Sequence, residues 1–98
     1  MPEPGLDPVI HAAPRLKAMA MLAAVDVVEF ARIRDALEVS DSVLSKHLAA
    51  LNEAGYVENR KLLSAGRRTT WLALTPAGRR AWRSHVAALR ALIEPDDE

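Results

Sequence analysis

The chain has 98 residues, half of them hydrophobic but only 4% aromatic, and its 13 basic and 13 acidic residues cancel in charge. This length suits one small domain with a thin core, and the balanced charge excludes a highly charged, disordered chain. The sequence contains no cysteine, which excludes disulfide scaffolds, cysteine-based zinc or iron–sulfur sites and thiol catalysis.

The first part of the chain carries the signals of two helices. Asp7-Pro8 predicts a helix start, because aspartate caps free backbone amides and proline suits the first turn. Pro14 is expected to kink or split this helix. A second helix is predicted over about 27–37, since Asp26 and Glu29 have the spacing of a capping box.

A third helix, over about 42–54, has clear boundary signals at both ends. Ser40-Asp41 offers its N-cap, and Gly55 is suited to end it in a left-handed conformation. Leu44, Leu48 and Leu51 share one face and predict packing against the domain. Two helices separated by a short connection have the proportions of a helix-turn-helix.

The residue pattern then changes to that of strands. Residues 56–63 and 69–74 are rich in β-branched, aromatic and leucine residues and flank Ser64–Arg68, which predicts a β-hairpin with a basic tip. Thr75-Pro76 opens a last helix by the same cap-and-proline pattern as the first. We predict one domain over 7–93, a disordered N-terminal tail over 1–6 and an acidic C-terminal tail over 94–98.

The zero net charge hides a strong asymmetry along the chain. Residues 59–93 contain eight lysines and arginines and no acidic residue, whereas residues 94–98 contain four acidic residues and no basic one. A cationic half on a neutral protein indicates an anionic partner that one face contacts.

Three helices, a hairpin and a final helix form the order of the winged helix-turn-helix, a mainly α fold with a small β-hairpin. The segment Leu44–Val57 resembles the recognition-helix region of MarR-like and ArsR-like transcriptional regulators. Leu74–Arg79 resembles the end of the wing and the start of the final helix in MarR-like proteins. With Gly66-Arg67-Arg68 in the wing, the resemblance covers about residues 10–93 and is closest to a compact MarR-like class.

This resemblance implies a sequence-specific regulator of transcription that binds double-stranded DNA, and it implies repression as a homodimer. The helix at about 42–54 would enter the major groove, and the wing at about 60–70 would contact the DNA backbone or minor groove. Full-length MarR-like regulators use longer terminal helices to help enclose a small-molecule pocket. No residue of this sequence supports an effector ligand.

The candidate DNA contacts lie on the outward face of the third helix and on the wing. Opposite the leucines, a helical wheel places small, polar and mildly basic side chains, which suit contacts with bases and phosphates. Arginines at a wing tip suit the negative potential of the minor groove. The predicted DNA-binding residues are Ser42, Ser45, Lys46, Ala49, Arg60, Lys61, Arg67, Arg68, Thr69 and Thr70.

The first and last helices carry more apolar surface than one short domain can easily cover. Packing them against the same helices of a second copy would bury this surface, which predicts a homodimer. The predicted interface residues are Met19, Leu22, Trp82, Val86, Leu89, Leu92 and Ile93.

Catalysis, metal binding and cofactor binding find no support in the residues. His11, His47 and His85 fall on three different predicted helices without metal-ligand spacing, so structural roles are expected for them. No nucleophile motif, phosphate-binding loop or catalytic carboxylate pair is present, which predicts that the chain is not an enzyme. With neither a signal peptide nor an apolar segment of membrane-spanning length, we expect a cytoplasmic protein without a membrane partner.

Two other functions fit the same predicted fold. The outward face of the third helix could contact another protein instead of DNA, although the basic segment 59–93 argues against such a module. A winged helix that binds RNA would use exposed aromatic residues for stacking, and Trp71 is the candidate for this role.

Overall fold

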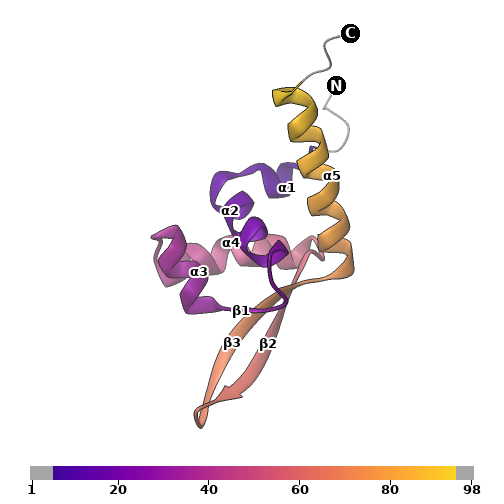
Figure 1. The fold of residues 1–98 in the computed structure, drawn as a ribbon. Helices are drawn as coiled ribbons and strands as arrows, with labels where there is room; N and C mark the ends of the chain where they lie inside the picture. The colour runs from indigo at the N-terminus through magenta and orange to yellow at the C-terminus, as the bar shows by residue number, and fades with distance from the viewer. Residues whose placement is uncertain (1–5, 95–98) are drawn as a thin grey trace.

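The computed structural model describes residues 6–94, so the predicted tails lie almost entirely outside the described residues. The fold is mainly helical with one small antiparallel sheet, as the sequence predicts, and a wing projects from one end while the last helix extends from the other (Figure 1). In chain order the elements are α1 (Pro8–His11), α2 (Ala13–Ala23), β1 (Val28–Glu29), α3 (Phe30–Leu37), α4 (Asp41–Glu53), β2 (Val57–Ser64), β3 (Arg67–Leu74) and α5 (Pro76–Ile93).

The predicted split of the N-terminal helix is confirmed. Asp7 caps α1, its carboxylate Oδ1 accepting hydrogen bonds from the amides of Val9 at 2.8 Å and Ile10 at 3.4 Å. Ala12 has an extended backbone between α1 and α2, and the proline at position 14 lies in the first turn of α2, where its missing N–H costs nothing.

The prediction of a helix beginning near residue 27 is wrong. Val28 and Glu29 form a short strand that pairs antiparallel with Leu72 and Trp71 of β3, and α3 begins only at Phe30. Glu29 is the N-cap residue of α3 and makes no capping hydrogen bond with its side chain, so no capping box is present. The wing is therefore part of a three-stranded sheet with the order β1-β3-β2.

Helix α4 ends as its glycine predicts. Gly55 has a positive φ of 81°. Its amide donates to the carbonyl of Asn52, and the amide of Tyr56 donates to that of Leu51 at 3.0 Å, which is the Schellman arrangement. Leu51 is fully buried together with Leu44, and the two pack in the single core that α2, α3 and the inner ends of the strands also line.

The hairpin turn is tighter than the sequence predicts. Strand pairing continues to Ser64 and Arg67, so only Ala65 and Gly66 form the turn, and both have positive φ values of 52° and 77°. A turn of two left-handed residues has a backbone twist that matches the right-handed twist of the flanking strands. The turn therefore connects β2 and β3 without forcing the strands apart. Arg67 and Arg68 consequently lie on β3 next to the turn.

Helix α5 is tied to both the wing base and the N-terminal segment. Thr75 caps the helix by accepting from the amide of Gly78 at 2.9 Å. Further along, the imidazole of His85 is fully buried, and its Nδ1 accepts from the backbone amide of Asp7 at 3.0 Å. Burial lowers the pKa of His85, and the nearby His11 ring lowers it further.

The hydroxyl of Tyr56 closes the same cluster by donating to Asp7 Oδ2. This hydrogen bond is the main cause that raises the pKa of the Tyr56 phenol. One aspartate thus connects the start of α1, the residue that precedes β2 and the middle of α5.

Candidate nucleic-acid interface

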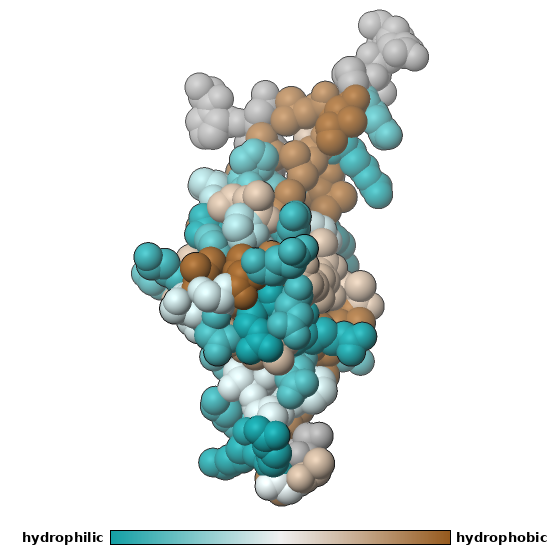
Figure 2. Space-filling view, turned by 90° about the vertical axis from the view of Figure 1, so that its left-hand side faces the viewer, coloured by the Kyte–Doolittle hydropathy of each residue, from teal (hydrophilic) through white to brown (hydrophobic). Residues whose placement is uncertain are grey.

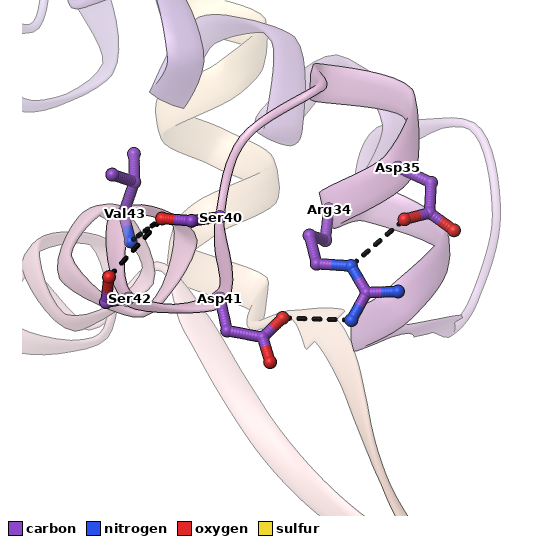
Figure 3. A network of polar contacts seen from close by, with 6 residues as sticks. All are labelled: Arg34, Asp35, Ser40, Asp41, Ser42 and Val43. Atoms are coloured by element: carbon purple, nitrogen blue, oxygen red, sulfur yellow. Dashed lines mark hydrogen bonds and ion pairs between the residues drawn. The ribbon is translucent and has the colours of Figure 1, made fainter.

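The outward face of α4 carries the side chains that the sequence assigns to DNA. Leu44, Leu48 and Leu51 are buried on the inner face. The four predicted contact residues of α4 are all exposed: Ser42, Ser45, Lys46 and Ala49. The first turn is fixed by Ser40, whose hydroxyl accepts from the amide of Val43 at 3.2 Å (Figure 3). The polar face is therefore presented by a capped helix.

An ion-pair network joins α3 to the beginning of α4. The guanidinium of Arg34 contacts Asp35 Oδ1 at 3.0 Å through Nε and Asp41 Oδ1 at 2.9 Å through Nη1, as Figure 3 shows. The hydrogen bond to Asp35 is the larger cause, and that to Asp41 the next, of a raised pKa of Arg34. Sequence reasoning missed this contact, although opposite charges on either side of the helix-turn-helix connection are a usable signal.

The wing presents its basic residues on two different faces. Because side chains alternate along a strand, Lys61 and Arg68 share the face on which Leu72 is buried, whereas Arg60 and Arg67 belong to the opposite face. The first face is next to α4, because Asn52 of that helix donates to the side chain of Asn59 at 3.3 Å.

Several of these wing side chains already have partners within the chain. The ammonium of Lys61 donates to the hydroxyl of Thr70 at 2.6 Å across the two strands. Arg60 pairs with Glu58 at 3.4 Å, and both side chains are about half exposed. Thr69 accepts from the indole nitrogen of Trp71 at 2.7 Å. The Trp71 residue is half-buried, which gives little support to RNA binding by base stacking.

A groove runs between α4 and the wing and brings these two sets together. Ser45 and Ala49 of α4 line one wall, and residues 67–70 of β3 line the other. Hydrophilic residues cover much of the middle of the molecule in Figure 2, whereas hydrophobic residues gather toward the end of α5. Acidic residues also line the groove, and Asp41 among them is paired with Arg34. Lys46, Arg60 and Lys61 lie outside this lining.

The predicted dimer residues divide into two groups. The assignment of Met19 and Leu22 is wrong, because both side chains are fully buried in the core of a single chain and have no surface to offer a partner. Packing of α2 against α3, α4, β3 and α5 covers them. On α5, Trp82, Val86 and Leu89 are half-buried, while Leu92 and Ile93 are 52% and 73% exposed.

The histidines contribute to packing in the described part of the chain. The rings of His11 and His85 meet edge-on with centroids 5.5 Å apart, a contact that the sequence spacing did not predict. His47 is half-buried, and burial lowers its pKa. Within residues 6–94, no three metal-ligating side chains come together, and no helix is both long and apolar enough to cross a membrane.

Comparisons with known proteins agree on the fold and on its type of partner. The family model described as winged helix DNA-binding domain matches residues 15–93. An uncharacterized protein of Methanocaldococcus jannaschii is 31% identical over 78 residues, which are 80% of this chain and 85% of that protein.

Solved structures of other proteins share the fold. A transcriptional regulator homologue from Pyrococcus horikoshii has a TM-score of 0.83 at 24% identity, with 92% of this chain and 89% of that one covered. A MarR-family transcriptional regulator from Silicibacter pomeroyi has a TM-score of 0.63 at 25% identity. The match covers 89% of this chain and 60% of that regulator, so this chain spans a little over half of the regulator's length.

Proposed function

The chain belongs to the winged helix DNA-binding domain family, and from this premise we propose that it is a homodimeric transcriptional repressor that reads a palindromic operator. DNA binding and a role in transcription regulation follow from the family and its MarR-like fold. The observation that carries the finer proposal is the groove that the exposed face of α4 and the basic wing form together.

The two walls of the groove suit two kinds of DNA contact. Ser45 and Ala49 of the α4 wall are short, and Lys46 is exposed on α4 outside the lining; all three can reach base edges when α4 lies in the major groove. The exposed arginines of β3 next to the turn suit phosphates or the minor groove, because they extend from a projecting hairpin. The helix would supply sequence preference, and the wing most of the sequence-independent affinity.

A second copy would pack against the outer end of α5. Leu89 is half-buried there, and Leu92 and Ile93 form an exposed apolar surface at the end of the molecule opposite the wing. Burying this surface in a dimer would orient two α4 helices about one DNA turn apart, so that two half-sites are read at once. Occupancy of a promoter by such a dimer would block transcription.

The experiment that tests this function is selection of bound fragments from genomic DNA with the purified full chain. We expect recovered fragments to share an inverted repeat whose half-site centres are separated by about 10 base pairs or a multiple of it. Recovery of a single unrepeated half-site would contradict the dimer. If no sequence is enriched and the protein is not retained on duplex DNA, the result contradicts DNA binding and favours a protein-binding module.

Lys46 and Arg68 are expected to act differently on the selected operator. Lys46→Ala should weaken binding by about 1–3 kcal/mol and reduce discrimination among operator variants, because a lysine on the recognition helix contacts bases. Arg68→Ala should weaken all duplexes more evenly, because phosphate contacts carry no direct sequence information. Fluorescence anisotropy with operator and scrambled duplexes measures both effects.

A matched control for these variants is Lys17→Ala, which removes an exposed cation of α2 that belongs neither to the groove lining nor to the outer end of α5. It should leave affinity and preference unchanged. All three side chains are exposed, so thermal melts should coincide with wild type. Equal loss of affinity in all three variants would show that the total charge, and not the position of each cation, determines binding.

A further inference from the structure

Leu63 is an exposed leucine near the end of the wing. Its side chain is 74% exposed, whereas the leucines of α4 and of the inner part of β3 are buried. A leucine at such a position leaves most of its apolar surface in water, so burial within the chain does not explain it. Single exposed apolar residues are common on proteins, and it is the surroundings of this one that indicate a partner.

Cationic side chains surround Leu63 on the wing. In the strand register it is opposite Arg68, and it shares a face with Lys61, two residues earlier on β2. This is the face of the hairpin next to α4, the helix proposed to enter the major groove. Because the turn consists of Ala65 and Gly66, Leu62 and Leu63 are the leucines next to the wing's outer end, and Leu63 is the more exposed of the two.

An apolar tip between cations matches the minor groove of DNA better than it matches an apolar protein surface. A protein partner of ordinary affinity needs a contiguous patch of several hundred Å², and the neighbours of Leu63 on this face are charged. The minor groove has anionic walls that attract the cations and stacked bases between which an apolar side chain can insert.

Resting on the proposed DNA-binding function, we propose that Leu63 is a wedge that enters the minor groove, partly unstacks one base step and bends the duplex. Arg68 and Lys61 would hold the flanking phosphates while the leucine inserts. The wing would then prefer pyrimidine–purine steps such as TA and CA, because these unstack at lowest cost. Leu63 thus becomes a residue that selects DNA by deformability, beyond the base edges read by α4.

The experiment compares Leu63→Ala with Leu62→Ala on operator duplexes that carry either a TA or an AA step under the wing. Leu62 is the matched control, since it is the preceding residue, is 39% exposed and belongs to the opposite face of the hairpin. Affinity is measured by anisotropy, DNA bending by circular-permutation electrophoresis, and unstacking by 2-aminopurine fluorescence at the step.

We expect Leu63→Ala to bind the TA operator about tenfold more weakly, to lose the bend and to lose the preference for TA over AA. Leu62→Ala should retain all three. If Leu63→Ala keeps wild-type affinity, bend and step preference while Arg68→Ala still weakens binding, the wedge is overturned and the DNA-binding function stands. If the wild-type chain fails to bind any duplex, the proposed function itself fails.

Discussion

Raising the salt concentration from about 50 to about 200 mM is expected to weaken operator binding about a thousandfold. Each wing extends four cationic side chains, Arg60, Lys61, Arg67 and Arg68, and all of them are exposed. If a dimer neutralises about six phosphates through these groups, release of condensed counterions gives this dependence. Anisotropy titrations at four or five salt concentrations measure the slope of log affinity against log salt.

The wing can be identified as the source of that slope. Replacing Arg67 and Arg68 together with alanine should make the slope shallower by about two for each arginine lost from both subunits. Lys17→Ala again serves as control, because this exposed cation is on α2 and not on the wing. A wild-type affinity that changes less than tenfold across this range would speak against phosphate binding and for a protein partner.

Gly78→Ala is expected to destabilise the fold by about 2–4 kcal/mol, the largest effect of any single substitution considered. A Cβ at position 78 would lie 2.1 Å from the backbone carbonyl oxygen of Tyr56. That carbonyl is held in place because it also accepts a hydrogen bond from the amide of Thr75 at 3.0 Å. Urea unfolding followed by circular dichroism gives the free energy of unfolding.

Gly66→Ala is the matched comparison for this substitution. A Cβ at position 66 would meet open space, so its only penalty is the positive φ of 77°, which costs about 1 kcal/mol. Helix propensity alone would make Gly78→Ala stabilising by up to about 1 kcal/mol, since alanine is the better helix former. A Gly78→Ala protein that is as stable as wild type would therefore refute the close approach of α5 to Tyr56.

Local signals predicted the order of elements and much of the helix-turn-helix. Caps at Asp7, Ser40 and Thr75 and the left-handed Gly55 act within four or five residues, so the sequence alone reveals them. The leucine spacing in α4 likewise predicted which of its faces is buried and which is exposed.

Features that depend on distant partners were not predictable in the same way. Val28 and Glu29 become a strand only because β3 pairs with them, and their local pattern favours a helix cap. Met19 and Leu22 were expected to be exposed, because the sequence does not show how many elements pack around α2. The end of α3 gave no glycine signal, since Glu38 takes the left-handed conformation there with φ 56°.

The candidate site was predicted as residue types but not as a geometry. The pleat separates Arg67 from Arg68, which follow one another in the sequence and looked like one basic tip. Asp41 lies beside Arg34 because of the angle between α3 and α4, and no residue pattern predicts that angle. The exposure of Leu63 was not predictable either. It follows Leu62 in one strand-like segment, and only the structure shows that Leu63 is the more exposed of the two.

The hydrogen bond between Asp7 and His85 has a consequence for how the protein assembles while it is being made. It joins residues 78 positions apart, and the bond from Tyr56 to the same aspartate spans 49. On the ribosome, Tyr56 can reach Asp7 before α5 emerges, but the backbone amide of Asp7 waits for His85 until α5 has been made, long after α2, α3 and α4 can meet. Helix α1 can pack on α2 and α4 earlier, through the buried Ile10, but its N-cap is fixed in place only when α5 docks and completes the polar cluster around Asp7.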